Sequence, residues 1–161
     1  MENKNHITYG LIGTAICVVL FLSQWFAKVA PDNAAFKWGS VLILGIIIIL
    51  SCINFSKING GDVTFGQVFA NGFKTTAVIT VLFTLVYIIF YLLVPSYKES
   101  MIEFSTKQQL DAGATADQVA AGREWMEKYF LVVAVGGIVF LDLLIGVVAS
   151  LIGAAIVKRK K

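Results

Sequence analysis

The sequence predicts an all-α integral membrane protein with four transmembrane helices and an external amphipathic helical hairpin between the third and fourth. Of its 161 residues, 58% are hydrophobic and only 14% are charged. In a soluble domain, roughly a quarter of the residues are charged. Four apolar stretches reach the roughly 18 residues that a membrane-spanning helix needs. No long stretch alternates apolar and polar residues as a strand would, so helices are the expected spanning form.

We treat the whole chain, 1–161, as one membrane domain. The apolar stretches lie near residues 7–27, 38–55, 74–94 and 129–157. The first is longer than the apolar core of a signal peptide, and "AKVAP" is a poor cleavage site because it contains Lys28. We therefore expect an uncleaved helix there.

An even number of spans places both termini on the same side of the membrane. Lysines and arginines are nearly balanced between the two sides, but one dense basic cluster directly follows the last span. It consists of Lys158, Arg159, Lys160 and Lys161. Such a cluster favours the cytoplasmic side and contacts with lipid head groups. We expect a multi-pass membrane protein with cytoplasmic termini, and no nucleic-acid partner.

The connection before the third span reads "GGDVTFGQVFANGFK". Thr64 and Gln67 have the spacing of a capping box, which predicts the start of a helix. Phe65 and Phe69 then give that helix an apolar side suited to lying at the membrane surface. The segment lacks the Gly-Lys-Ser/Thr ending of a phosphate-binding loop, so we do not assign one.

Residues 96–128 form the only sizeable segment outside the four expected spans. Their sequence predicts the external helical hairpin. Pro95 ends the third span, and Gly113 separates the two hairpin helices. Thr115 caps the second helix, which is expected to continue into the fourth span through Trp125, a residue suited to the membrane interface. The acidic residues are scattered among basic ones, which predicts a solvated polar face rather than a divalent-metal site.

The sequence offers little that resembles catalytic chemistry. Cys17 and Cys52 lie at different depths and are too few for a zinc or iron–sulfur site, so we expect two small buried side chains. His6 is expected to be solvated, and no base lies at membrane depth to activate a serine. We expect no enzyme activity, no cofactor and no metal.

Asp142 is the one carboxylate in the middle of an apolar span. Its insertion costs roughly 2.5–3.5 kcal/mol, so it should face the protein interior and find a partner. Four small residues lie within about a 100° arc of the same helix, which predicts close packing against another helix. This predicted seam consists of Gly146, Ala149, Ser150 and Gly153.

A polar stripe on the third span offers partners for Asp142. The stripe consists of Thr76, Thr80, Thr84, Tyr87 and Tyr91. Because Thr84 is near the middle of residues 74–94, we predict a hydrogen bond between Asp142 and Thr84 or Tyr87. In the alternative reading, the threonines bond their own i−4 carbonyls and the tyrosines only pack.

Three segments, in order along the chain, carry a family resemblance: "GDVTFGQVFANGFK", "VPSYKESMIE" and "TADQVAAG". Over most of its length the chain resembles a bacterial family of four-span inner-membrane proteins catalogued as domain of unknown function 4199. The resemblance implies the architecture and the location, and it brings no activity, cofactor or catalytic residue with it.

Two functions remain open from the sequence. The first is an accessory or scaffolding subunit that assembles with other membrane proteins, or with copies of itself, through helix–helix contacts. The second is a small transporter or proton-conducting module that uses Asp142 with the Thr/Tyr stripe of the third span. Four spans without a visible internal repeat are few for alternating access, so the first is preferred.

Overall fold

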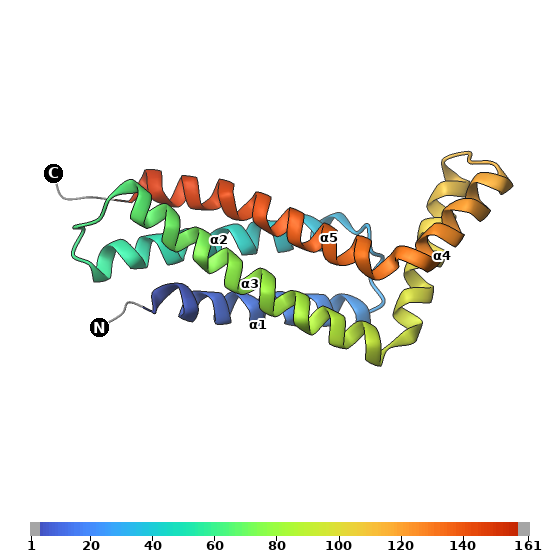
Figure 1. Ribbon diagram of the computed structural model, residues 1–161, viewed down its shortest axis with the longest axis horizontal. Coiled ribbons are helices and arrows are strands. Elements are labelled where there is room, and N and C mark those ends of the chain that lie inside the picture. The colour runs from blue at the N-terminus through green and yellow to red at the C-terminus, as the bar shows by residue number, and fades with distance from the viewer. Residues whose placement is uncertain (1–3, 158–161) are drawn as a thin grey trace. The chain divides into compact units, whose positions relative to one another are not determined.

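The computed structural model of the chain describes residues 4–157, and every regular element in that range is a helix (Figure 1). The helices are α1 (Asn5–Phe26), α2 (Ala34–Ile58), α3 (Phe65–Leu93), α4 (Pro95–Asp111) and α5 (Ala116–Ile156). All except α4 are long and apolar enough to cross a membrane. This confirms the predicted class, an all-α membrane protein.

The chain divides into two compact units. The first, which we call the bundle unit, comprises residues 1–83 and 139–161, and the second, the hairpin unit, comprises residues 84–138. Helices α3 and α5 each contribute one part to each unit.

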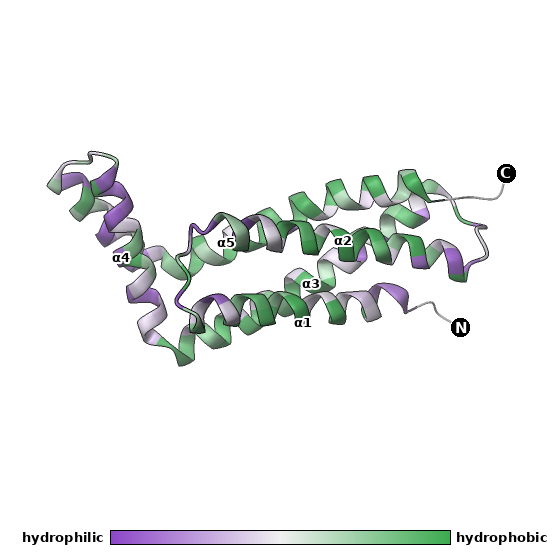
Figure 2. Cartoon of the chain, turned by 180° about the vertical axis from the view of Figure 1, so that it is seen from behind, coloured by the Kyte–Doolittle hydropathy of each residue, from purple (hydrophilic) through white to green (hydrophobic). Residues whose placement is uncertain are grey.

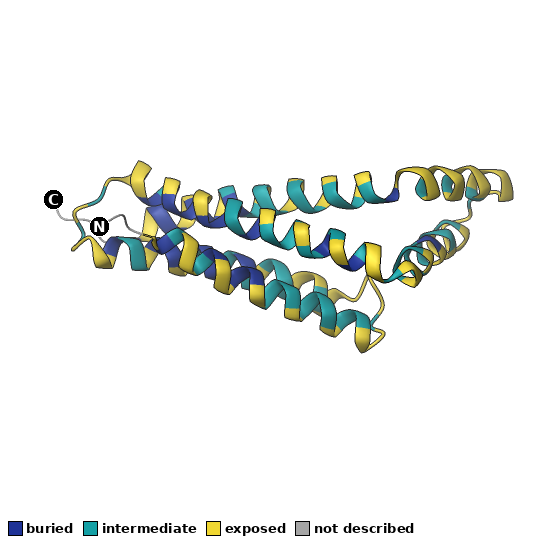
Figure 3. Cartoon of the chain, turned by 60° about the horizontal axis from the view of Figure 1, so that its bottom comes forward, coloured by how far each residue is buried: buried dark blue, intermediate teal, exposed yellow. Residues whose placement is uncertain are grey.

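The outer surface of the bundle unit is largely apolar, and Figure 2 shows hydrophobic residues along most of α1 and α2. Its core consists of Leu44, Ile47, Ile48, Ile79 and Ala149. Outward-facing apolar side chains such as Leu42 and Val148 remain more than half exposed, and the buried positions follow the inward faces of the helices (Figure 3). A helix that is hydrophobic all round is expected where lipid, rather than water, contacts its outer face.

Short polar caps fix where several helices begin. The side chain of Asn33 accepts hydrogen bonds from two backbone amides at the start of α2. Thr64 and Gln67 form the predicted reciprocal capping box before α3, with distances of 2.8 and 3.2 Å. Thr115 and Gln118 form the second one before α5, at 2.9 and 3.4 Å.

The third helix begins earlier than the sequence predicted. Residues 65–73 were expected to lie at the membrane surface before a span near 74–94, yet they are the first turns of α3 itself. Nothing after the capping box interrupts the helix, and Val68 is completely buried. Phe65 stays exposed, whereas Phe69 packs against the buried cluster around Cys52. These turns therefore belong to the bundle core and not to a separate surface helix.

The hairpin unit contains α4 and the first part of α5. Pro95 occupies the first turn of α4, and Gly113 adopts φ +84° in the turn between α4 and α5. The predicted continuation of the second hairpin helix into the fourth span is confirmed, because α5 runs unbroken for 41 residues. At 1.5 Å per residue it is about 60 Å long, roughly twice the thickness of a bilayer's hydrocarbon core.

Candidate functional site

Asp142 lies half-buried on α5 and accepts a hydrogen bond from the hydroxyl of Thr80 on α3, with 3.3 Å between Thr80 Oγ1 and Asp142 Oδ2. This distance is long for a bond from a hydroxyl, which is usually 2.5–3.0 Å. It is the one hydrogen bond that Asp142 accepts from the residues that the structure describes. Since a carboxylate offers about four acceptor positions, most of its capacity is unused in this part of the chain.

The partner of Asp142 is one helical turn away from the predicted one. The prediction for Thr84 is wrong, because its hydroxyl is buried and finds no partner within residues 4–157. The error follows from the early start of α3. Its midpoint lies at Ile79, next to Thr80, whereas the expected span 74–94 has its midpoint at Thr84.

The two tyrosines of the predicted stripe take part in aromatic contacts of the hairpin unit. Tyr87 meets the ring of Tyr97 edge-on, with 5.8 Å between centroids, and Tyr91 stacks on Phe130 at 5.7 Å. Burial raises the pKa of Tyr97 by more than its hydrogen bond with Tyr87 lowers it. Tyr87 and Phe130 of this aromatic cluster are buried, and Tyr91 and Tyr97 are partly buried.

The small residues of α5 lie against α2 and α3. Gly146 contacts the side chain of Thr76, and Ala149 belongs to the bundle core. A Cβ atom added at Gly153 would lie 2.7 Å from the Cβ of Cys52. This proximity leaves no room for a larger side chain at that point.

A close junction joins Gly72 of α3 to Ser150 and Cys52. A Cβ atom added at Gly72 would lie 2.6 Å from Ser150 Oγ and 2.7 Å from Cys52 Sγ. Ser150 is fully buried, and its hydroxyl has no hydrogen-bond partner in the described part of the chain. Both cysteines are free thiols, but Cys17 is only partly buried while Cys52 is completely so.

Sequence reasoning missed a buried polar cluster that joins the ends of α1, α2 and α3, which we call the amide clamp. It consists of Asn5, Ser51, Asn54, Asn71 and Thr75. The Asn5 amide donates towards the Ser51 carbonyl (2.9 Å) and the Asn71 side-chain oxygen (3.2 Å). In turn, the Asn54 amide donates to the Asn5 side-chain oxygen at 2.7 Å.

The other half of the clamp joins α2 to α3. The Asn71 amide lies 3.0 Å from Ser51 Oγ, which is also 2.7 Å from Thr75 Oγ1. Taken one at a time, these residues look like ordinary polar residues near the ends of spans. The order of the spans could have revealed the clamp. Since neighbouring spans are antiparallel, the start of α1, the end of α2 and the start of α3 lie at the same level of the bundle.

Two groups of residues were expected at the membrane interfaces, and their place relative to a membrane stays a prediction. Trp125 is 53% exposed, and its ring lies 5.7 Å from that of Tyr129. The basic cluster 158–161 lies outside the described residues. Within those residues, no three His, Cys, Asp or Glu side chains come together in a way that would hold a metal ion.

Comparison with known proteins identifies a family. No curated protein and no solved structure matches the chain. One family model, described as "Protein of unknown function (DUF4199)", matches residues 8–159, which is nearly the whole sequence. The chain therefore belongs to the DUF4199 family.

Proposed function

We propose that the protein is a non-enzymatic accessory or scaffolding subunit of the bacterial inner membrane, with both termini in the cytoplasm. It assembles through helix–helix contacts made by α5 with another membrane protein or with a second copy of this chain. The observation that carries this proposal is the incomplete hydrogen bonding of Asp142.

The energy balance at Asp142 supports a partner. Interhelical hydrogen bonds in membranes contribute about 0.6 kcal/mol each and reach about 1.7 kcal/mol. A single long bond from Thr80 offsets only a part of the roughly 2.5–3.5 kcal/mol that a mid-span carboxylate costs. Donors from another chain would use the remaining acceptor positions and close this gap.

The packing of the bundle unit supports a rigid role. Glycines at positions 72, 146 and 153 bring α5 and α3 against their neighbours with no spare space. The amide clamp adds hydrogen bonds between α1, α2 and α3 at one end. Alternating access would require these helices to separate, at the cost of several buried polar contacts.

A second candidate, a small transporter or proton-conducting module, is favoured by the polar face of α3. Thr76 and Thr80 are buried on this face, and the second of them reaches Asp142. A transport path predicts that water reaches the carboxylate, whereas an assembly contact predicts a dry site.

The experiment that separates these functions is co-purification in mild detergent from the native membrane. Two differently tagged copies are expressed, and bound proteins are identified by mass spectrometry. We expect a stoichiometric partner, or the second copy, to be reduced at least tenfold by Asp142→Leu. The matched control is Leu144→Ala, which changes an exposed residue of the same helix and should leave the partner bound.

Two results would contradict the assembly proposal. One is the absence of any partner in both samples, and the other is a partner that Asp142→Leu retains in full. Proton flux into reconstituted vesicles that is abolished by Asp142→Asn would then establish the transport function instead.

A further inference from the structure

The hairpin unit contains an apolar pocket of about 300 Å³. Its walls come from α4 and α5, with the ring of Tyr87 from the end of α3. The residues that matter here are Tyr97, Met101, Phe104, Trp125, Met126 and Phe130. The volume is at the lower end of the range for small-molecule sites, about 300–1,000 Å³, and roughly twice that of a cavity that holds benzene.

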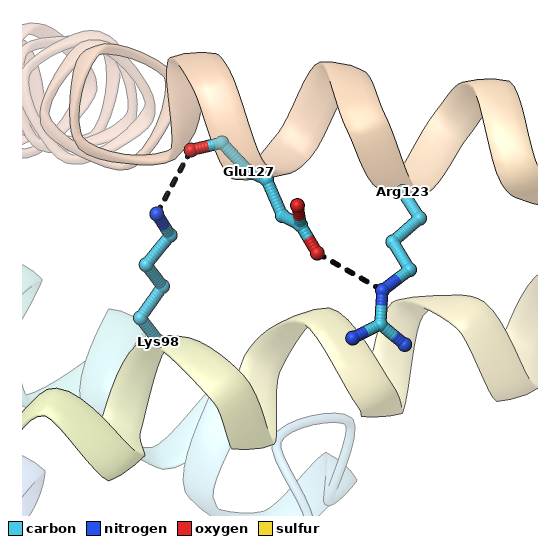
Figure 4. A network of polar contacts seen from close by, with 3 residues as sticks. All are labelled: Lys98, Arg123 and Glu127. Carbon is cyan, nitrogen blue, oxygen red and sulfur yellow. Dashed lines mark hydrogen bonds and ion pairs between the residues drawn. The ribbon is translucent and has the colours of Figure 1, made fainter.

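Contacts on both sides of the pocket keep α4 and α5 in place. At one side, Lys98 Nζ donates to the backbone carbonyl of Glu127 at 2.8 Å, as Figure 4 shows. At the other, the side chain of Gln109 lies against Gly122. A Cβ atom added at Gly122 would lie 2.7 Å from Gln109 Oε1. These two contacts join the helices whose side chains line the pocket.

The pocket is continuous with the apolar part of a span. Its lining extends along α5 from Trp125 to Val133 and Ala134, which belong to the apolar stretch expected to enter the membrane. A hydrocarbon chain can therefore pass from the bilayer into the pocket without crossing a polar surface. Met101 and Met126 suit such an occupant, because flexible thioether side chains adapt to an irregular, mobile ligand.

Two lysines beside the pocket are the cationic groups that an anionic head group would meet. Among the described residues, the only salt bridge joins Arg123 to Glu127, at 3.0 Å (Figure 4). Lys98 instead bonds a carbonyl, and Lys128 lies over the ring of Tyr129 at 5.3 Å. Neither lysine forms an ion pair with a carboxylate in this part of the chain, so each ammonium group can still contact a phosphate.

We propose that the pocket of the hairpin unit binds one acyl chain of an anionic membrane phospholipid, whose phosphate lies near Lys98 and Lys128. This site is independent of the proposed assembly through Asp142. It would make the hairpin a lipid-binding element at the membrane surface.

The test is photocrosslinking of the full-length protein in vesicles of phosphatidylethanolamine and phosphatidylglycerol at three to one. A small fraction of the phosphatidylglycerol carries a diazirine at the end of one acyl chain, and labelled residues are mapped by peptide mass spectrometry. Met101, Phe104 and Met126 should be labelled at least fivefold more than Leu110. Leu110 is the internal control because it is exposed on the same hairpin but does not line the pocket.

Substitutions then test the pocket itself. Ala134→Phe fills it and should reduce this labelling at least fivefold, whereas Ala120→Phe, at an exposed position of the same helix, should not. If Ala134→Phe fails to fold, as judged by circular dichroism, Ser105→Leu fills the pocket from α4. Two further probes, phosphatidylcholine and a free fatty acid that carry the same diazirine, show whether the bound acyl chain must belong to an anionic phospholipid.

Equal labelling of Leu110 and Met101 would overturn the proposal, because it would mean that the whole hairpin is immersed in lipid. So would labelling that persists when the pocket is filled. Labelling by the free fatty acid alone, or by phosphatidylcholine as strongly as by phosphatidylglycerol, would reject an anionic phospholipid as the ligand.

Discussion

Removing Asn71 from the amide clamp should destabilise the bundle by about 2 kcal/mol. The Asn71 side chain makes three interhelical contacts, one with Asn5 at 3.2 Å and two with Ser51 at 3.0 and 3.3 Å. At about 0.6 kcal/mol for each interhelical bond, Asn71→Ala loses close to 2 kcal/mol of unfolding free energy. The Asn5 amide, 7% exposed, also loses its acceptor on α3.

The free energy of unfolding can be measured by SDS titration of the protein in bicelles. Asn59→Ala is the matched control, because among residues 4–157 the Asn59 side-chain amide bonds only the carbonyl of Phe55 on the adjoining helix α2. A double-mutant cycle between Asn5→Ala and Asn71→Ala should give a coupling energy of about 0.6 kcal/mol and at most about 1.7 kcal/mol. A coupling near zero, or equal stability of Asn71→Ala and Asn59→Ala, would refute the reasoning.

Three further predictions follow from packing, capping and burial. Gly72→Ala should destabilise by about 1–3 kcal/mol because its methyl group overpacks the junction, whereas Gly45→Ala, with open space around it, should be neutral or slightly stabilising in the same titration. Thr64→Ala removes a capping-box hydroxyl and should cost about 1 kcal/mol, detectable as lower unfolding free energy with unchanged fold by circular dichroism. Because burial raises the pKa of Tyr97, its neutral form is favoured when folded, so stability should fall as pH rises above about 10. Tyr97→Phe should reduce this loss of stability at high pH. If the unfolding free energy of the variant depends on pH as that of the unchanged protein does, Tyr97 is not its cause.

The four spans and the hairpin could be predicted because their signals are local. Apolar length identifies a span, and Thr64 with Gln67 or Thr115 with Gln118 identifies a helix start without reference to other helices. The start of α3 was misjudged because Asn71 and Lys74 lower the local hydropathy and resemble an interface. In the folded chain Asn71 is buried against α1 and α2, so the helix continues past it.

The site was harder to predict because it depends on register between helices. The arc of small residues on α5 identified the face towards α2 and α3, but not which threonine would meet Asp142. That choice depends on how far α3 extends, and a shift of four residues moves the partner from Thr84 to Thr80. The amide clamp depends on three helices at once, so no single segment reveals it.

The amide clamp also has a consequence for the order of events during synthesis. Asn5 and its acceptor on α3 are 66 residues apart in the chain, and Asn5 and Ser51 are 46 apart. At about 5–20 residues per second, the ribosome needs roughly 3–13 s to add the 66 residues that separate Asn5 from Asn71. Until Asn71 is added, the Asn5 amide lacks one of its final acceptors, although Ser51 is already present. The amide clamp is therefore complete only when α3 has been synthesised. In a chain arrested before Asn71, fewer hydrogen bonds would hold α1 and α2 together.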